Sequence, residues 1–461
     1  MTDFLTAAEA ARRLGVKPAT LYAYVSRGVL RRSKAPDGRG SLFDSDEVER
    51  LARRGRPRRP PGAADITVES AITEIAGDRL RYRGLDVLRL ATTRPFEDVA
   101  ELLWTGELPA PQPAGDAQSA RDAQSARDAQ SARDTRPAGP PGSPGSAPWR
   151  ATPAALAAGR GAQAALPAGT LPLERFQVIV PAMAATDPLR LQLDPAAVVA
   201  AGRSIIAGLV DCLPMPAQPG AHPADTPGQS STAQSSAGPD HPGTGPDQAI
   251  ADRLWPRLGG GRASPALRRA LSAALVLLAD HELAASTLAA RVAASVRADP
   301  YAVVETGMGA MSGTLHGGAS LGVETLLAAA GGPEDVPRVV GELLRRGEKV
   351  PGFGHLIYKA GDPRAVLLLD LVRRAAPKSG PLAVADAVLA EIRRKSLPEP
   401  NIDLAVATLV RVAGMIRGSG EAIFAVARTA GWIAHALEAY AGGGPLRPRA
   451  VYTGPSAIID P

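Results

Sequence analysis

Four short segments of the chain combine histidine, arginine or aspartate with glycine or proline, and their residue types are suited to chemistry. They are Asp280-His281-Glu282, Leu315-His316-Gly317-Gly318, Gly352-Phe353-Gly354-His355 with Asp362-Pro363-Arg364, and Pro400-Asn401-Ile402-Asp403. Glycine beside a histidine adds no side-chain bulk, so a substrate can approach the imidazole closely. A carboxylate with two imidazoles suits proton abstraction next to a carbonyl, because one base removes the C–H proton and a neutral donor stabilises the enolate.

The arginines near these segments indicate a substrate with two or three carboxylates. A guanidinium group binds a carboxylate through two parallel hydrogen bonds. A metal site is a weaker interpretation, because the sequence contains no HxxxH, HxH or HExxH spacing and only one cysteine, Cys212. We therefore expect no metal.

Each candidate also has a structural interpretation. His281 could end a helix and bond to backbone, and His316 and His355 could simply mark turns. Asp403 could be a helix N-cap, because Pro400-Asn401 precedes it and an apolar stretch follows. Lone arginines most often form surface ion pairs. His435 lies on a predicted amphipathic helix, and we interpret it as structural.

The elements that must position these segments are predicted to be helices. Apolar residues recur at helical spacing over Leu267–Ala279, Leu283–Arg297, Pro337–Arg346, Ala365–Arg374, Leu382–Arg394 and Gly420–Tyr440. Alternating runs of β-branched residues are scarce. The sequence thus predicts a mainly α fold with Gly- and Pro-containing loops.

Two segments interrupt the helical pattern. Residues 109–170 are rich in Pro, Gly and Ala and hold three copies of DAQSAR, and residues 214–248 are rich in Pro, Gly, Ser and Gln. Such compositions cannot bury enough apolar surface to order themselves. We predict both as disordered inserts.

The excess positive charge of the chain lies at its N-terminus. The whole chain carries 52 Lys+Arg, 46 Asp+Glu and a net charge of +6, and residues 1–60 alone sum to +7. Thr6 and Glu9 have capping-box spacing ahead of a helix over Ala7–Leu14. A second helix over Ala19–Val25, a turn at PDGRG between two short strands, and a closing helix over Asp44–Arg54 complete the prediction.

This order resembles the MerR/excisionase-type winged helix-turn-helix module, notably through TAAEAARRLGVKPATLYAYVSRGVL. The resemblance implies binding to double-stranded DNA. The second helix would offer Lys17, Thr20, Tyr22 and Tyr24 to the major groove, while phosphates would be held by Arg27, Arg31 and Arg32. The alternative is a small helical module for dimerisation or protein contact.

The remaining motifs, in their order along the chain, resemble the citrate synthase family. They are AITEIAGDRLRYRGLDVLRLA (71–91), FEDVAELLWTGELP (96–109), ADHELAASTLAARVAAS (279–295), GAMSGTLHGGA (309–319), VPGFGHLIYKAGDPRA (350–365), PNIDLA (400–405), FAVARTAGWIAHALEAY (424–440) and RPRAVYTGP (447–455). The resemblance implies large and small helical domains after a winged helix-turn-helix at 1–54 and a basic, Pro-rich linker at 55–63. The synthase-like domain would span 64–461, with its small domain at about 320–423.

The resemblance also implies roles. Asp403 would take a methyl proton from acetyl-CoA, His316 would donate to the thioester oxygen, and His355 would polarise the keto group of oxaloacetate. Condensation and hydrolysis would give citrate and CoA. The substrate-binding residues implied are His281, Arg364, Arg428, Arg447 and Phe424. Arg447 would come from the second subunit of a homodimer, and no metal or organic cofactor is implied.

Two departures from the family pattern concern substrate choice. Leu404-Ala405-Val406 replaces an aromatic residue followed by Ser-Gly, and Leu356 replaces the arginine that follows the second histidine in many bacterial members. An altered acyl pocket could favour propionyl-CoA and yield 2-methylcitrate, because one CH₂ changes selectivity by only ~1–3 kcal/mol. A metabolite-sensing transcription regulator with an inactive synthase domain is the other alternative.

The sequence favours a cytoplasmic protein without a membrane partner. The N-terminal MTDFLTAAEAARRLG is polar and mixed in charge, unlike a signal peptide. The longest apolar stretch, near Leu271–Ala279, is about half the length of a spanning helix. A single cysteine also fits a reducing compartment.

Overall fold

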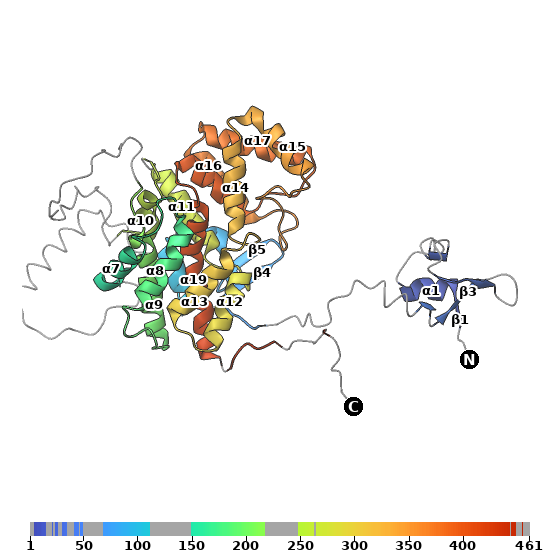
Figure 1. Ribbon diagram of the computed structural model, residues 1–461, viewed down its shortest axis with the longest axis horizontal. Helices are drawn as coiled ribbons and strands as arrows, with labels where there is room; N and C mark the ends of the chain where they lie inside the picture. The colour runs from blue at the N-terminus through green and yellow to red at the C-terminus, as the bar shows by residue number, and fades with distance from the viewer. Residues whose placement is uncertain are drawn as a thin grey trace, which may run out of the picture. The chain divides into compact units, whose positions relative to one another are not determined.

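The computed structural model describes residues 4–14, 21, 24–25, 30–34, 41–45, 47–48, 68–110, 149–216, 248–261, 264–442, 444–448 and 454. The chain divides into two compact units (Figure 1). Unit 1 comprises Met1–Glu69 and Arg447–Pro461, and unit 2 comprises Ser70–Leu446.

The described part of unit 1 includes the helix α1 and a three-stranded antiparallel sheet in the order β1-β3-β2. Its elements are β1 (Phe4–Thr6), α1 (Ala7–Leu14), β2 (Ser33–Lys34) and β3 (Ser41–Asp44). The predicted capping box is confirmed, because Thr6 N donates to Glu9 Oε2 at 2.9 Å and Glu9 N donates to Thr6 Oγ1 at 3.4 Å. A small core around Leu21 and Phe43 holds the unit together. Most of the predicted helices over 19–25 and 44–54, and all of the linker at 55–63, lie outside the described residues.

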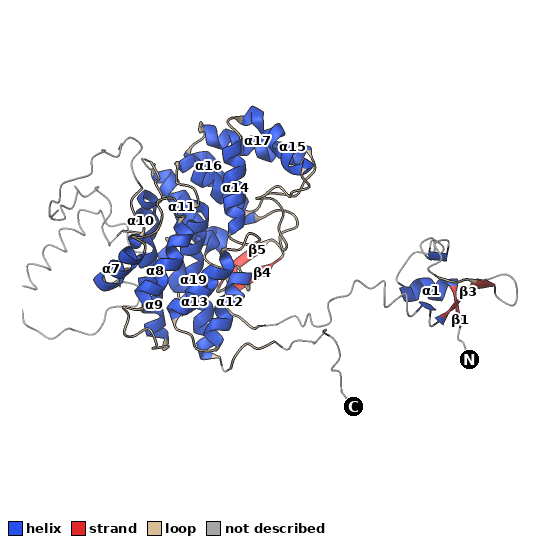
Figure 2. Ribbon diagram, viewed as in Figure 1, coloured by secondary structure: helices blue, strands red, loops and turns tan. Residues whose placement is uncertain are grey.

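The described residues of unit 2 are mainly helical, as the sequence predicts, and include a small antiparallel sheet in the order β4-β5-β6 (Figure 2). Its first part holds β4 (Thr73–Ala76), β5 (Arg79–Tyr82), β6 (Leu85–Asp86), α4 (Val87–Thr93), α5 (Phe96–Thr105), α7 (Pro153–Ala162), α8 (Pro172–Ala184), α9 (Pro195–Cys212), α10 (Ile250–Arg257), α11 (Pro265–Leu278), α12 (Ala285–Ser295) and α13 (Pro300–Met311). It continues with α14 (Gly318–Ala329), η1 (Pro333–Asp335), α15 (Val336–Arg345), α16 (Pro363–Ala375), α17 (Gly380–Arg394), α18 (Ile402–Ala413) and α19 (Ser419–Ala441).

Helix starts in unit 2 follow simple local chemistry. A side-chain oxygen accepts from a backbone N–H at the starts of α9, α11, α13 and α16, and a proline occupies the first turn of each of these helices.

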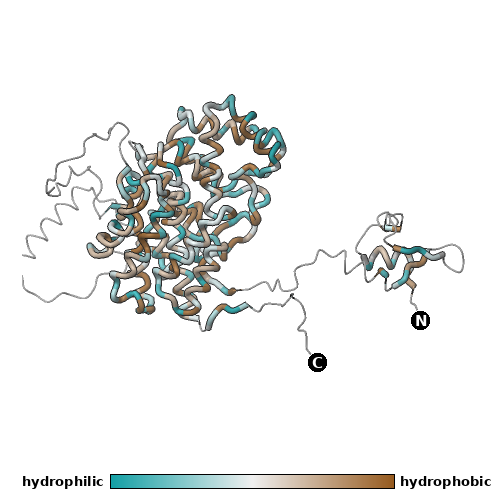
Figure 3. Tube along the Cα trace, in the orientation of Figure 1, coloured by the Kyte–Doolittle hydropathy of each residue, from teal (hydrophilic) through white to brown (hydrophobic). Residues whose placement is uncertain are grey.

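Hydrophobic and hydrophilic stretches alternate along the helical trace (Figure 3). The most buried element is α19, which packs against α5, α9, α11, α12 and α13.

Helices α14 to α18, together with η1, pack on one another and form the upper lobe of unit 2 in Figure 1. We call this group the small lobe and the rest of unit 2 the large lobe. The predicted small-domain range, about 320–423, contains most of the small lobe and the start of α19.

The prediction of a disordered insert over 109–170 is wrong for its last part. Residues 153–162 form α7, whose Gly159 packs closely against Cys212 and Ile179. Tertiary burial therefore orders a segment whose composition is that of a linker. Residues 111–148 of the first predicted insert and 217–247 of the second lie outside the described residues.

Helix α9 is long and apolar enough to cross a membrane, alone among the helices of the described residues. Most of it is buried inside unit 2, which is the environment of a core helix. It therefore gives no support to a membrane assignment.

Candidate active site

Unit 2 brings seven of the eight predicted catalytic and substrate-binding residues onto neighbouring elements. His281 lies in the turn between α11 and α12, and His316 in the turn between α13 and α14. The others occupy the segment before α16, the first turns of α16 and α18, and the middle of α19. The eighth residue, Arg447, is exposed and belongs to unit 1.

One group of side chains centres on Tyr358. The Tyr358 hydroxyl lies 3.0 Å from His281 Nε2, and the His281 and His355 rings meet edge to face with centroids 5.4 Å apart. The Arg364 guanidinium lies over the Tyr358 ring at 5.4 Å. Three predicted residues thus contact the same aromatic side chain, to which the sequence motifs assign no role.

The buried Arg364 is held by an acidic neighbour. Arg364 Nε and Nη2 donate to the two oxygens of Asp362 at 3.0 and 2.8 Å. Asp362 Oδ2 also accepts from Ile402 N at 3.1 Å, at the start of α18. This buried pair therefore joins α16 to the helix that carries Asp403.

A second group surrounds His316. Its Nε2 lies 2.7 Å from Ser286 Oγ, and its ring meets Phe424 edge to face at 5.7 Å. The Arg428 guanidinium lies over the ring of Phe424, 4.7 Å from its centroid. Arg428 Nε donates to Leu278 O at 2.8 Å, whereas its Nη1 is buried without a partner.

The position of Asp403 depends on two loops that are bonded to each other. Asn401 caps α18 by accepting from Asp403 N at 3.0 Å, so Asp403 itself is not the N-cap that its sequence context allowed. Asn401 Nδ2 donates to Gly354 O at 3.0 Å, and a backbone bridge joins Phe353 and Pro400. The loop before His355 and the loop before Asp403 are thereby held together.

Hydrogen bonds define the tautomer of His355. Its Nδ1 accepts from Ile357 N at 3.0 Å and from Tyr358 N at 3.3 Å. An acceptor nitrogen carries no proton, so Nε2 carries it in the neutral ring. His355 is therefore prepared to donate from Nε2.

The electrostatic environment keeps the three site histidines neutral at neutral pH. Burial and the charge of Arg364 hold the pKa of His281 well below its ordinary value. Burial and the charge of Arg428 lower the pKa of His316 to about 4. Burial, followed by the charge of Arg364, also lowers the pKa of His355. Neutral imidazoles can act as hydrogen-bond donors without giving up a proton.

Asp403 has the opposite shift. Burial raises its pKa, and a hydrogen bond of 2.8 Å from Ser320 Oγ partly offsets that effect. A carboxylate with a raised pKa is a stronger base. Asp403 is thus the residue of this group best suited to remove a proton.

A cavity of about 490 Å³ lies beside His355. Its lining is mostly apolar and includes Leu344, Val350 and Phe353. Glu348 and Lys349 are charged residues of the same lining. Leu356, one of the two departures noted in the sequence, also lines it and is 89 % exposed. The cavity therefore adjoins the His355 side of the site.

Four residues that hold the predicted ones in place received no role from the sequence motifs. They are Ser286, Ser320, Tyr358 and Asp362. Asp362 and Tyr358 carry a signal in the sequence, because they fall in the segment between His355 and Arg364. The two serines carry none, since nothing in their local sequence distinguishes them from helix-surface serines.

The described residues of unit 1 include three of the seven predicted DNA-binding residues. Arg31 and Arg32 are exposed next to β2, and Arg31 N donates to Glu47 Oε2 at 3.0 Å. Tyr24 is half-buried and packs against the small core. Lys17, Thr20, Tyr22 and Arg27 lie outside the described residues.

Comparisons with known proteins agree with this division of the chain. A family model described as citrate synthase, C-terminal domain, matches residues 63–449, and a helix-turn-helix domain model matches residues 4–56. Citrate synthase 2 of Bacillus subtilis is 39% identical over 216 residues, which cover 45% of this chain and 57% of that protein. A citrate synthase of Haloferax volcanii is 37% identical over 215 residues, with the same two coverages. The chain thus spans about half the length of the curated relatives it matches.

Solved structures show the same fold. Citrate synthase from Thermotoga maritima aligns with a TM-score of 0.60 and 24% identity, over 87% of this chain and 96% of that one. Citrate synthase from Thermoplasma acidophilum, solved in a ternary complex with carboxymethyl coenzyme A and oxaloacetate, aligns with a TM-score of 0.62 and 23% identity, over 86% of this chain and 96% of that one.

Proposed function

The chain belongs to the citrate synthase family, and we propose that it condenses an acyl-CoA, first of all acetyl-CoA, with oxaloacetate and water to give citrate and CoA. The observation that carries the proposal is the arrangement of Asp403, His316 and His355. A base with a raised pKa and two neutral imidazoles lie on separate elements, and the charge of Arg428 acts on both Asp403 and His316.

Oxaloacetate would bind on the side of the large lobe that holds Arg428. Its carboxylates would bind to Arg428 Nη1 and to His281. Arg364, which is paired with Asp362, would add positive charge to the site. His355 would donate from Nε2 to the keto oxygen and so draw electrons from the carbon under attack. Arg447 of the partner subunit would complete the anion site in a homodimer.

The acyl-CoA would be activated by Asp403 and His316. Asp403 would remove a proton from the methyl carbon, and His316 would donate a hydrogen bond to the thioester oxygen as the enol forms. Donation by the Ser286 hydroxyl to His316 Nε2 would leave the ring proton on Nδ1 for that purpose. The enol carbon would then attack the keto carbon, and water would hydrolyse the citryl-CoA thioester.

The comparisons support this pair of substrates, because the Thermoplasma acidophilum citrate synthase was solved with carboxymethyl coenzyme A and oxaloacetate. The proposed reaction calls on no resident metal or organic cofactor, since CoA arrives and leaves with the substrate. We propose a cytoplasmic location, which fits such water-soluble substrates and the free, buried Cys212.

The test is release of CoA by the purified chain with oxaloacetate, comparing acetyl-CoA with propionyl-CoA. Turnover that falls by about 10²–10⁴-fold in Asp403→Asn supports the proposal, because that is the contribution of a general base. A preference for propionyl-CoA would make the product 2-methylcitrate. Absent turnover, with oxaloacetate binding intact by calorimetry, would favour the metabolite-sensing regulator.

We further propose that unit 1 binds double-stranded DNA. The helix-turn-helix match over 4–56, the excess positive charge of that region and the exposed Arg31 and Arg32 support it. Binding should weaken with salt, and the double variant Arg31→Ala/Arg32→Ala should reduce the slope of log K against log[salt] by about 2. Absence of any salt-dependent affinity would favour a protein-contact module.

A further inference from the structure

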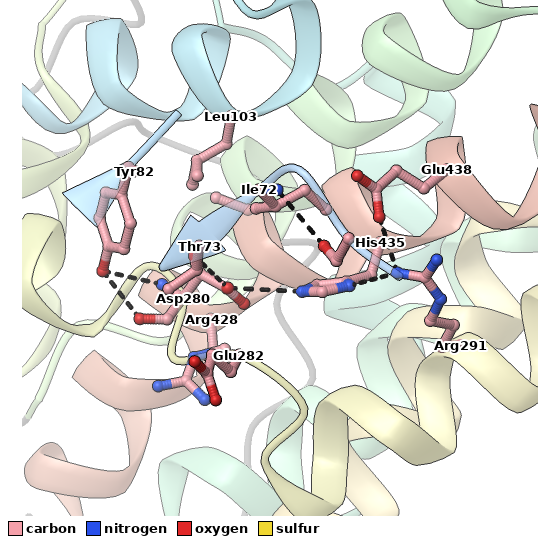
Figure 4. A network of polar contacts seen from close by, with 12 residues as sticks. Ile72, Thr73, Tyr82, Leu103, Asp280, Glu282, Arg291, Arg428, His435 and Glu438 are labelled. Atoms are coloured by element: carbon pink, nitrogen blue, oxygen red, sulfur yellow. Dashed lines mark hydrogen bonds and ion pairs between the residues drawn. The ribbon is translucent and has the colours of Figure 1, made fainter. Parts of the chain in front are cut away.

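One fully buried carboxylate lies behind the proposed site and takes no part in the proposed chemistry. Asp280 precedes His281 in the turn between α11 and α12. Its Oδ2 accepts from Thr73 Oγ1 at 2.6 Å and faces His435 Nε2 at 3.4 Å (Figure 4). Its Oδ1 is buried without a hydrogen-bond partner. An ionised carboxylate in such a place needs a nearby positive charge.

Arg428 supplies that charge without bonding to Asp280. No hydrogen bond joins the two side chains within the described structure, yet each acts on the other. Burial lowers the pKa of Arg428, and the charge of Asp280 is the strongest opposing influence. Burial likewise opposes ionisation of Asp280, and contact with His435, the charge of Arg428 and the Thr73 hydroxyl together lower its pKa.

The other buried arginine of the site is held differently. Asp362 occupies Nε and Nη2 of Arg364 with two short hydrogen bonds. Arg428 instead uses Nε on the backbone oxygen of Leu278 and keeps Nη1 free. A counter-charge that is close but not bonded therefore leaves Arg428 available to an incoming carboxylate.

A chain of buried and half-buried groups fixes the direction of the Asp280 carboxylate. Arg291 Nη1 donates to Glu438 Oε2 at 2.7 Å and lies 2.9 Å from His435 Nδ1. Because arginine can only donate, His435 Nδ1 accepts and the ring proton sits on Nε2, which faces Asp280. Figure 4 shows Glu438, Arg291, His435, Asp280 and Thr73 in this order.

We propose that Asp280 is a positioning residue for oxaloacetate binding, with His435 as its restraint. Asp280 balances the charge of Arg428 through space, and the bonds to Thr73 and His435 keep its carboxylate from turning to pair with Arg428. Arg428 Nη1 then stays free for a substrate carboxylate. This inference rests on the proposed function.

The test compares His435→Leu with His435→Gln. Glutamine keeps an acceptor for Arg291 and a donor for Asp280, whereas leucine keeps neither. We expect His435→Leu to raise both the calorimetric Kd and the KM for oxaloacetate about tenfold, which corresponds to one lost hydrogen bond to a charged group. The KM for acyl-CoA should be unchanged, and His435→Gln should bind oxaloacetate within about threefold of the wild type. Thr73→Val should act in the same direction as His435→Leu.

Thr429→Val is the matched control. Thr429 follows Arg428 in α19, is buried, and donates only within the helix, to Ala425 O at 2.8 Å. This variant should lower the melting temperature without changing the oxaloacetate Kd. An unchanged Kd in His435→Leu, or an equal rise in Thr429→Val, would overturn the inference. A wild-type chain that does not bind oxaloacetate would overturn the proposed function as well, so the two failures are distinguishable.

Discussion

The hydroxyl of Ser320 donates a hydrogen bond of 2.8 Å to Oδ1 of Asp403. Ser320 lies in the first turn of α14 and Asp403 in the first turn of α18, so the bond joins two helix starts within the small lobe. His316 lies just before α14. The proposed base and the proposed enol-stabilising histidine are therefore held by the same end of one helix.

Removal of this hydroxyl should shift the pH dependence of turnover. A hydrogen bond to a carboxylate favours its charged form, so Ser320→Ala should raise the already raised pKa of Asp403 further. Because the ionised form is the base, the acid limb of the kcat profile should move to higher pH by about one unit. Ser419→Ala, which removes a buried hydroxyl bonded to Ile416 O, should leave the profile unchanged. An unmoved acid limb in Ser320→Ala would show that Asp403 does not limit the rate.

The buried pair of Asp362 and Arg364 should matter more for stability than any surface pair. Asp362→Asn leaves the buried Arg364 charge uncompensated and weakens the anchoring of Ile402 N. We expect a loss of about 3–5 kcal/mol in the free energy of unfolding, measured by denaturant titration. Asp386→Asn is the control, because its pair with Arg373 is exposed and should change stability by about 0.5 kcal/mol or less. Equal losses in the two variants would contradict the assigned role of the buried pair.

A positive charge at position 356 should strengthen binding of the CoA thioester. Leu356 is exposed and lines the cavity beside His355, near Lys349. Coenzyme A carries phosphates, and a guanidinium binds them with paired hydrogen bonds. Leu356→Arg should lower the KM for acyl-CoA severalfold at low salt, with less effect at high salt. Leu356→Gln, which adds a polar group without charge, should change it little, and an unchanged KM in Leu356→Arg would place the phosphates elsewhere.

The sequence predicts helices well where apolar spacing is regular. The stretch predicted over Gly420–Tyr440 is α19, and that over Leu382–Arg394 lies within α17. Helix α7 escapes prediction because its Ala- and Gly-rich composition is shared with linkers. Its order depends on the contact of Gly159 with Cys212, 53 residues along the chain and invisible to local pattern.

The predicted site residues meet in space, but their partners were predicted less well. Motif matching predicts His281, His316 and Asp403. Nothing in the sequence indicates that Asp362 accepts hydrogen bonds from both Nε and Nη2 of Arg364. The structural interpretation of His435 agrees with its buried network. Side-chain pairing depends on rotamers and loop geometry, which spacing alone does not encode.

Stability should fall between weakly acid and neutral pH because of Glu421. This residue lies in the first turn of α19 and is 5% exposed. Burial, and then the charge of Glu324, raise the pKa of Glu421 from 4.5 to about 7. Between these values the native state keeps a proton that the unfolded state has lost, so the free energy of unfolding decreases as pH rises and levels off above about 7.

Glu421→Gln removes the cost of ionisation. It should melt at a higher temperature than the wild type at pH 8, by about 2–4 °C for each kcal/mol recovered, with little difference at pH 5. Glu305→Gln, on the exposed face of α13, removes the same charge and should show no such pH dependence. Thermal unfolding at the two pH values measures the effect, and a Glu421→Gln variant that is less stable than the wild type at pH 8 would mean that the ionised carboxylate is stabilising.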